Sequence, residues 1–188
     1  MIRIPLYLEV AQWALLFGLG TLLVVLYRQL GRMLSSATDT QSPGPAVGTK
    51  AAPIRYAHVP SGSPGRLTPG DGQPALIAFV DPTCLSCEQL VANMSELEAA
   101  GELGGIRVLL LVSDPPGYLG ISAVFQATSL EIGRPLAAAE VSGYHVTGTP
   151  LLVAIDGDGV IRAAGATSKL TDVRAHAATI VRESEAAR

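Results

Sequence analysis

The stretch Asp81-Pro82-Thr83-Cys84-Leu85-Ser86-Cys87 contains both cysteines of the chain. It follows Ala75-Leu76-Ile77-Ala78-Phe79-Val80, a short continuous apolar run that is typical of a strand buried on both faces. Beyond the stretch, Gly101 can end a helix whose apolar positions recur at helical spacing, namely Cys87, Leu90, Val91, Met94 and Leu97. The cysteine pair is therefore expected where a buried strand gives way to a helix.

The spacing of the two cysteines favours redox chemistry. At the start of a helix, unpaired N–H groups and the helix dipole stabilise a thiolate on Cys84. Cys87 follows one turn later on the same helix face, within reach of the Cys84 sulfur. We expect Cys84 to attack a substrate disulfide and Cys87 to resolve the mixed disulfide. Thr83 is expected to cap the helix and to touch the site.

Roles without redox chemistry fit the pair less well. A structural disulfide is disfavoured, because closing a loop of four residues removes little entropy from the unfolded chain. A zinc half-site needs two more ligands, and His58, His145 and His176 are scattered without paired spacing. A pair of inert buried cysteines stays open. No metal or bound cofactor is expected.

The rest of the C-terminal region, residues 75–188, predicts an α/β domain. Strands are expected at Ile106–Val112, Leu151–Ile155 and Val160–Ala164, the last two joined by a hairpin turn at Asp156-Gly157-Asp158-Gly159. Helices are expected at about Tyr118–Leu130, Leu136–Tyr144 and Leu170–Arg182. This alternation predicts a mixed sheet covered by helices.

The N-terminal region, residues 1–34, is expected to be a membrane anchor. Val10 to Tyr27 are 18 residues without a charge, and a helix over about residues 6–27 is long enough to cross ~30 Å of hydrocarbon. A cleavable signal peptide is disfavoured, because the run is long and no A-x-A site follows. The amino terminus and Arg3 lie on one side of this run, and Arg28 and Arg32 lie on the other. The positive charges nearly balance, with a slight preference for a cytoplasmic C-terminal domain.

Residues 35–74 are expected to be a flexible linker. Seven of the 13 prolines fall here, with Gly, Ser and Thr between them and no sustained apolar period. A short strand around Ile54–Val59 is the one element anticipated in its later part. Such a tether would let the following domain reach partners near the bilayer.

The composition excludes some classes of function. The net charge is −3 and no Lys/Arg cluster occurs, so a nucleic-acid partner is not expected. Apolar residues make up 48% of the chain and charged residues only 15%, which fits a chain with part of its length in lipid.

A second motif lies some sixty residues after the cysteines. Val146-Thr147-Gly148-Thr149-Pro150 leads directly into an expected buried strand. A proline at the start of a strand is compatible with a cis peptide bond, although on its own an ordinary trans turn would be favoured.

The Cys-x-x-Cys stretch, the Gly148-Thr149-Pro150 motif and the Asp156-Gly157-Asp158-Gly159 turn together resemble the thioredoxin superfamily, from about residue 74 to the C-terminus. The resemblance implies a thioredoxin-like fold for this region, which the transmembrane helix expected from the apolar run would precede. It also implies that Pro150 is a cis-proline facing the disulfide and that Thr149 offers backbone hydrogen bonds to a bound substrate segment.

Within the superfamily, Pro82-Thr83-Cys84-x-x-Cys87 and the N-terminal anchor ending Tyr27-Arg28-Gln29-Leu30-Gly31 resemble the methylamine-utilisation MauD proteins and TlpA-like redoxins. That resemblance implies a redox domain on the periplasmic side of the inner membrane. We adopt this orientation in place of the one that the nearly balanced charges slightly favour. It implies as partners a client protein with a disulfide or dithiol, such as the small subunit of methylamine dehydrogenase, and another membrane redox protein.

The chain departs from the superfamily pattern at three positions. Thr83 stands where Trp usually precedes the first cysteine, and Ala78 replaces a buried Asp that shuttles a proton to the resolving thiol. Leu90 replaces a Glu of cytochrome-maturation relatives. The motif therefore brings no evident general base, although Asp81, Glu88 and water are candidates, and the direction of the chemistry stays open.

Two functions of other classes stay open. A peroxiredoxin-like peroxidase shares the fold, but its usual loop would need Thr at position 81, where this chain has Asp. A non-catalytic thioredoxin-fold binding module would not depend on its two cysteines.

Overall fold

The structure is a computed structural model that describes residues 12–13, 15–21, 44–113 and 123–186. The chain divides into two compact units, Met1–Gln41 and Ser42–Arg188. In the first unit, residues 12–13 and 15–21 are helical and expose large apolar side chains, among them Trp13 and Phe17. No helix within the described ranges is both long and apolar enough to cross a membrane. Most of the expected anchor helix lies outside these ranges.

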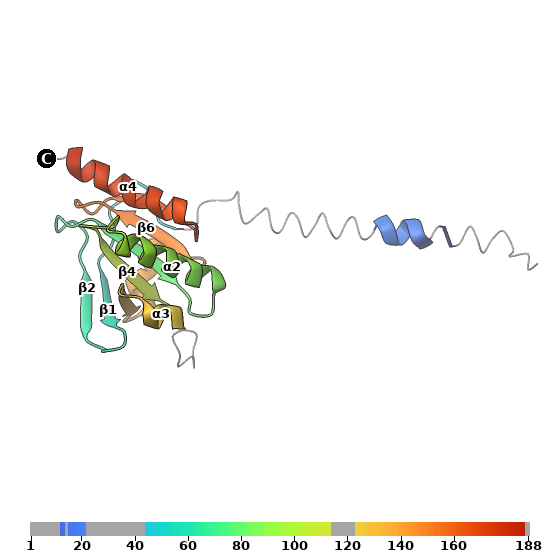
Figure 1. Cartoon of the computed structure of the whole chain (residues 1–188), viewed down its shortest axis with the longest axis horizontal. Helices are drawn as coiled ribbons and strands as arrows, with labels where there is room; N and C mark the ends of the chain where they lie inside the picture. The colour runs from blue at the N-terminus through green and yellow to red at the C-terminus, as the bar shows by residue number, and fades with distance from the viewer. Residues whose placement is uncertain (1–11, 14, 22–43, 114–122, 187–188) are drawn as a thin grey trace, which may run out of the picture. The chain divides into compact units, whose positions relative to one another are not determined.

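The second unit is built on a seven-stranded mixed sheet with the order β2-β1-β5-β4-β3-β6-β7 (Figure 1). Three central strands run parallel, and the strands on either side of them are antiparallel to their neighbours. The strands are β1 (Ile54–His58), β2 (Pro64–Leu67), β3 (Ala75–Val80), β4 (Arg107–Val112), β5 (Glu131–Pro135), β6 (Leu151–Ile155) and β7 (Ile161–Gly165). The α/β class and the mixed sheet expected from the sequence are thus confirmed.

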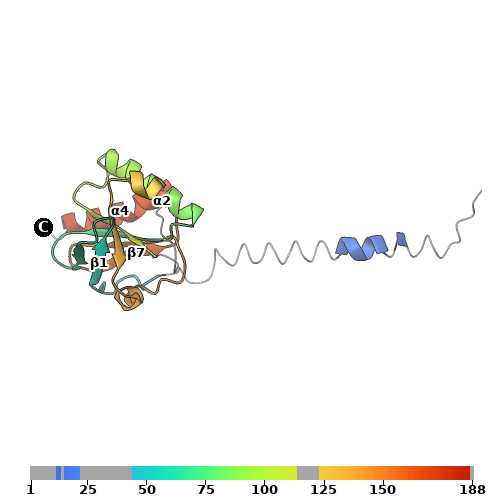
Figure 2. The ribbon, with the colours of Figure 1, turned by 90° about the horizontal axis from the view of Figure 1, so that it is seen from below.

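One face of the sheet is covered by α2 (Leu85–Ala99), α3 (Ala123–Ala127) and α4 (Leu170–Ala186). Figure 2 shows α2 and α4 on the same side of the strands. The apolar positions that the helical spacing of α2 predicts are buried in this layer, from Cys87 to Leu97. Because these residues recur every three to four positions, they form one stripe against the strands.

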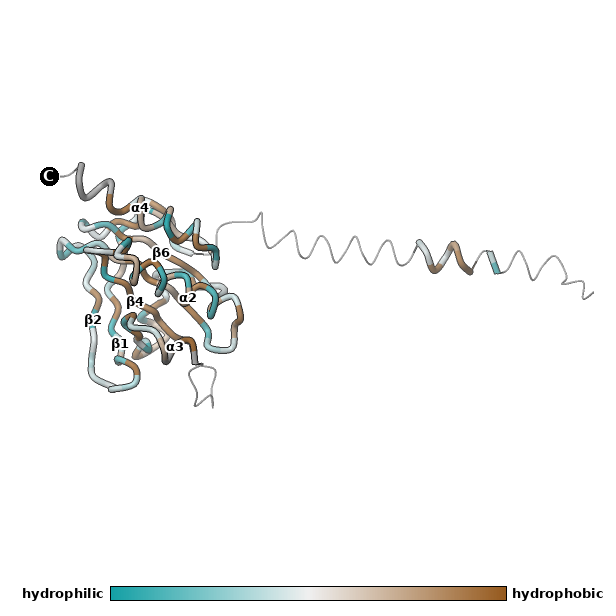
Figure 3. The backbone as a smooth tube through the Cα atoms, in the orientation of Figure 1, coloured by the Kyte–Doolittle hydropathy of each residue, from teal (hydrophilic) through white to brown (hydrophobic). Residues whose placement is uncertain are grey.

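The other face is covered by the 3₁₀ helix η1 (Ala138–Tyr144) and by residues 51–52. The ring of Tyr144 lies 5.3 Å from that of Phe79, and the Tyr144 hydroxyl donates to the Ala52 carbonyl at 2.5 Å. The central strands β3 and β6 are buried along their whole length because both faces are covered. Apolar colouring follows the central strands in Figure 3.

The folded unit begins well before residue 75, so the expected linker is wrong over residues 44–74. The anticipated strand around Ile54–Val59 is present as β1, but it pairs with both β2 and β5. Further upstream, Lys50 forms a bridge with Val160, and Pro45 is buried. Residues 35–43 of the expected linker lie outside the described residues.

The sequence-based prediction also missed β5 and overestimated one helix. Gly133 and Pro135 interrupt the apolar pattern of β5, which forms nevertheless because β4 and β1 supply partners on its two sides. The helix expected at Tyr118–Leu130 is described only as α3, which ends at Ala127. There the Thr128 hydroxyl accepts a hydrogen bond from the Leu130 N–H.

Candidate active site

Cys84 lies at the junction of β3 and α2, as the sequence predicts. Its backbone is extended, with φ −96° and ψ 114°, and its sulfur accepts a hydrogen bond from the Cys87 N–H at 3.3 Å. Cys84 itself is therefore the N-cap of α2, and the expectation that Thr83 caps the helix is wrong. The N–H and the hydroxyl of Thr83 both donate to the Asp81 carboxylate instead, at 2.8 and 2.6 Å.

The two cysteines differ in exposure, which suits them to different steps. Both are free thiols, and Cys84 is partly exposed whereas Cys87 is completely buried. Burial raises the pKa of the Cys87 thiol well above its usual value, because the charged form loses its hydration. Hydrogen bonds from the Asp81 N–H and the Thr149 side chain act in the opposite direction. Cys84 is therefore the thiol that a protein substrate can reach first.

The Thr149–Pro150 motif contacts the Cys-x-x-Cys motif. The Thr149–Pro150 peptide bond is cis, and Pro150 is buried beside the start of β6. The Cys84 thiol donates to the Thr149 carbonyl at 3.8 Å. The structure thus brings together Cys84, Cys87, Thr149 and Pro150, while Thr83 lies exposed at the edge of this group.

Asp81 is a site residue whose contacts the sequence did not predict. Its N–H donates to the Cys87 sulfur at 3.5 Å, and its carbonyl accepts from the Cys84 N–H at 3.1 Å. The available signal was Asp two residues before Thr, because an Asp side chain commonly accepts from the N–H two residues on.

The interior beneath Cys87 is apolar. Ala78 and Leu90, the two positions at which the sequence resemblance led us to look for an acid, are both fully buried in the helix-covered core. Among the described residues Asp156 is the one buried charged side chain, and it follows Ile155, which pairs with Ala75 at the far end of β3. No buried carboxylate in the described part of the chain therefore lies beside the Cys87 thiol.

The three histidines lie on separate elements. His58 ends β1 with its ring 3.6 Å from the Glu131 carboxylate, His145 follows η1 and is exposed, and His176 lies on α4. No three His, Cys, Asp or Glu side chains gather in a metal-binding arrangement within the described ranges.

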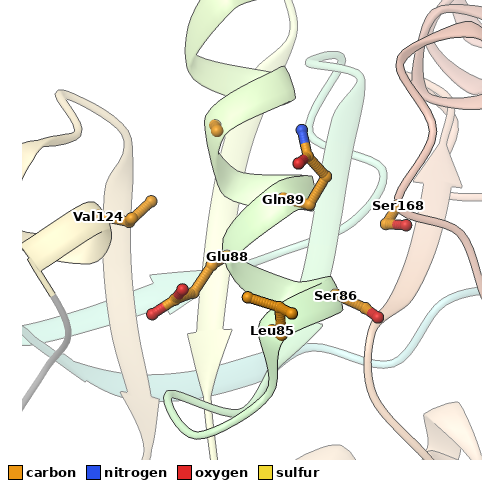
Figure 4. Close-up of a pocket in the computed structure, with 7 residues that line it drawn as sticks. Leu85, Ser86, Glu88, Gln89, Val124 and Ser168 are labelled. Atoms are coloured by element: carbon orange, nitrogen blue, oxygen red, sulfur yellow. The ribbon is translucent and has the colours of Figure 1, made fainter.

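The surface beside the motif is mostly apolar. Leu85, between the two cysteines, is 81% exposed. It borders an open groove of about 490 Å³ whose wall includes Val124 of α3 and Ser168 before α4 (Figure 4). Glu88 contributes the one charged group among the described lining residues.

The sheet order, the Cys-x-x-Cys pair at the N-terminus of α2 and the cis-proline opposite it define a thioredoxin-like fold. Solved structures agree. The thioredoxin domain of a thiol-disulfide oxidoreductase from Bacteroides vulgatus matches with a TM-score of 0.58 and 16% identity, covering 69% of this chain and 96% of that one. A protein described as the thiol:disulfide interchange protein DsbE from Chlorobium tepidum matches with a TM-score of 0.60 and 18% identity, covering 74% of this chain and 99% of that one. StoA from Bacillus subtilis matches with a TM-score of 0.55 and 12% identity, covering 69% of this chain and 98% of that one.

No protein-family model matches the chain, and no curated protein matches it in sequence. At these identities the structural likeness shows the fold, and the activity is argued from the site itself.

Proposed function

We propose that this chain is a membrane-anchored thiol-disulfide oxidoreductase that exchanges disulfides with client proteins through Cys84 and Cys87. The observation that carries the proposal is the pairing of a partly exposed Cys84 at a helix N-terminus with a buried Cys87 one turn later. The thioredoxin-like fold supports it, as do structural neighbours described as a thiol-disulfide oxidoreductase and a thiol:disulfide interchange protein.

The exchange needs no bound cofactor. The Cys84 thiolate attacks one sulfur of a client disulfide, a Cys84–client bond forms, and the second client sulfur leaves as a thiolate. The Cys87 thiolate then attacks the Cys84 sulfur, the Cys84–client bond breaks, and the Cys84–Cys87 disulfide forms. Two electrons pass from the protein dithiol to the client, and the two thiol protons end on the client sulfurs. Run backwards, the same steps oxidise a client dithiol.

The proposed substrate is a protein segment rather than a small thiol. The Thr149 main chain lies next to the Cys84 sulfur, and Leu85 offers apolar surface beside it. An extended segment with a cysteine could lie against this main chain, because exposed backbone groups pair with extended peptides. A periplasmic client such as the small subunit of methylamine dehydrogenase is the finer proposal, and it rests on the resemblance of Pro82-Thr83-Cys84-x-x-Cys87 to MauD proteins.

The anchor is proposed from the uncharged run Val10 to Tyr27 and from the exposed apolar side chains of the described helical residues in it. Apolar side chains exposed along a helix need a covering, and lipid supplies one. We place the redox domain on the periplasmic side of the inner membrane, where a membrane redox protein would exchange electrons with it. Carbonate extraction tests the anchor, and labelling of Cys84 in intact cells by a membrane-impermeant thiol reagent tests the side.

The activity is tested by an equilibrium redox titration of the full-length protein in detergent, with each point read by thiol alkylation and mass. Interconversion of Cys84 and Cys87 as one two-electron couple supports the proposal. A potential near that of thioredoxin, roughly −270 mV, indicates a reductase, and a value well above it indicates an oxidant. If no reversible disulfide forms, the exchange mechanism is wrong and a binding module is favoured. Rapid peroxide consumption would instead favour a peroxidase.

A further inference from the structure

Asp81 contacts the cysteine turn through its side chain, its N–H and its carbonyl. Its carboxylate oxygen Oδ1 accepts from the Thr83 N–H at 2.8 Å and from the Thr83 hydroxyl at 2.6 Å. We call this pair of hydrogen bonds the Asp81–Thr83 clasp. The Asp81 carbonyl accepts from the Cys84 N–H at 3.1 Å, and the Asp81 N–H donates to the Cys87 sulfur at 3.5 Å. One residue therefore contacts both cysteines through its backbone and closes the turn through its side chain.

The backbone on either side of the clasp is already fixed. Val80 pairs with Val112 in the parallel sheet, and its carbonyl accepts from the Ser113 N–H at 2.9 Å. Pro82 is buried, and its ring restricts φ. The rotation that remains lies between Asp81 and Thr83, and the clasp closes that segment. The Asp81 N–H shares a planar peptide unit with the Val80 carbonyl, so the sheet already fixes its direction. The clasp holds the turn from Asp81 into α2, and the place of the Cys87 sulfur relative to that N–H thus depends on the clasp.

The Cys87 sulfur needs a hydrogen-bond donor more than Cys84 does. It is completely buried against the apolar core, and the groups that donate to it are the Asp81 N–H and the Thr149 side chain. A buried thiolate without a donor is strongly disfavoured, and a hydrogen bond to the charged form offsets part of that cost. The residues at the two positions where relatives carry an acid are Ala78 and Leu90, which offer no polar side-chain group.

We propose that Asp81 is a positioning residue, whose clasp with Thr83 fixes the turn into α2 so that the Cys87 sulfur stays against the Asp81 N–H, which favours the second step of exchange. In that step the Cys87 thiolate attacks Cys84, the Cys84–Cys87 bond forms and the client sulfur leaves with the electron pair. The proton lost by Cys87 reaches the departing client sulfur through water. The effect on the exchange step rests on the proposed function. The effect on the pKa of the Cys87 thiol does not, because it can be measured without any client.

The Asp81 carboxylate could act through its negative charge rather than through the hydrogen bonds of the clasp. Substitutions at Asp81 and Thr83 separate these two effects. Asp81→Asn keeps an oxygen that accepts both hydrogen bonds of the clasp and removes the charge, whereas Asp81→Ala removes both. Thr83→Val removes only the hydroxyl hydrogen bond, and Thr83→Ser restores a hydroxyl. Asp71→Ala is the matched control. The Asp71 carboxylate also accepts from the N–H two residues on, that of Gln73 at 3.1 Å, but before the start of β3, the end away from the cysteines.

The first measurement is the release of a chromogenic thiol from its mixed disulfide with Cys84, in the full-length protein in detergent. We expect Asp81→Ala to slow release about tenfold, Thr83→Val to slow it less, and Asp81→Asn and Thr83→Ser to recover most of the rate. Asp71→Ala should match the wild type. Formation of the mixed disulfide, measured with Cys87→Ser present, should change far less than its release. If Asp81→Asn is as slow as Asp81→Ala, or if both steps slow equally, the proposal is wrong.

The second measurement does not depend on exchange. In a Cys84→Ser background, which removes the titratable group that acts on Cys87 in the structure, the pH dependence of the Cys87 ¹³Cβ chemical shift, measured by NMR on labelled protein, reports the pKa of Cys87. We expect Asp81→Ala and Thr83→Val to raise this pKa and Asp81→Asn to leave it closer to the parent value. Equal pKa values in all variants would overturn the positioning role even if the protein exchanges disulfides. The expected shifts would uphold it even if no client disulfide reacts.

Discussion

The thiol of Cys84 lies 3.8 Å from the main-chain oxygen of Thr149, 65 residues further along the chain. This contact joins the helix N-terminus to the loop that carries the cis Thr149–Pro150 bond. A client sulfur that reaches Cys84 must therefore approach beside the Thr149 main chain. Cys87 is completely buried whereas Cys84 is partly exposed, so a client disulfide meets Cys84 first.

The two cysteines should fail differently when replaced. Cys84→Ser should reduce disulfide exchange to background, because the buried Cys87 cannot be reached by a protein disulfide. Cys87→Ser should still react once and then accumulate a mixed disulfide with the client. Non-reducing electrophoresis after incubation with a disulfide-bonded peptide distinguishes them. Accumulation of the adduct in Cys84→Ser instead would reverse the assigned order.

The release step should depend on pH through Cys87. Because burial raises the pKa of this thiol, only a small fraction is thiolate near neutral pH, and that fraction grows as the pH rises. We expect release of the mixed disulfide to accelerate by about tenfold per pH unit between pH 7 and 9. Stopped-flow kinetics with a chromogenic leaving thiol measure it, with Cys87→Ser as the control. A rate that is independent of pH would show that deprotonation of Cys87 does not limit release.

Gly133 of β5 should not tolerate a side chain. A Cβ at this position would overlap the ring of Tyr56, which is completely buried on β1. We expect Gly133→Ala to lower the free energy of unfolding by about 1–3 kcal/mol, because overpacking forces neighbouring groups to shift. Urea denaturation measures it, with Gly148→Ala as control, since a Cβ at Gly148 meets no atom within 4 Å.

A double-mutant cycle assigns that loss to the ring. In a Tyr56→Leu background, Gly133→Ala should cost clearly less than in the wild type, because contacting residues show coupled effects. Equal costs in the two backgrounds would mean that the strain comes from elsewhere in β5.

Asp156 should stabilise the fold in a pH-dependent way. It is 3% exposed, and its carboxylate accepts from the Val160 N–H at 2.8 Å and from the Arg162 guanidinium at 2.6 Å. Burial alone would raise the pKa of Asp156, but these hydrogen bonds outweigh it and lower the pKa below its usual value. The stabilisation is therefore complete above the unfolded-state pKa of about 3.9 and is lost as the pH falls through the folded-state value.

Accordingly, Asp156→Ala should lower the free energy of unfolding by about 2–4 kcal/mol at pH 7. The difference from the wild type should shrink in strongly acidic solution, where the wild-type carboxyl is protonated. Urea denaturation at pH 7 and in strongly acidic solution checks this. Asp158→Ala, which replaces an exposed aspartate in the same turn, is the control. A difference that is the same at both pH values would mean that the charge of Asp156 contributes nothing.

Part of the candidate site could be predicted from local sequence. The apolar run at 75–80 and the helical spacing that starts at Cys87 place the cysteine pair at a strand–helix junction, and the structure has it there. Thr83 as the cap was wrong, because a Thr next to a Cys gives no local signal about which side chain turns toward the helix. That choice depends on the Asp81 carboxylate, which already binds both donors of Thr83.

The β2-β1-β5 side of the sheet also depends on partners that are distant in sequence. β1 and β2 lie within a stretch rich in Pro and Gly, and β5 contains both Gly133 and Pro135. A short strand was anticipated at β1, whose first three residues alternate between buried and exposed, but β2 and β5 show no clear period of two. They exist because a neighbour satisfies their backbone hydrogen bonds, and the neighbour is remote in sequence.

The sequence by itself determined the α/β class, strands β3, β4, β6 and β7, α2 and the chemistry of a paired Cys84 and Cys87, because these depend on side-chain periodicity and spacing within a few residues. The tertiary structure decided which sulfur is buried, that the Thr149 carbonyl lies against Cys84, and that Asp81 contacts both cysteines. Burial and hydrogen-bond geometry arise only when segments that are distant in sequence pack together, so no local pattern encodes them.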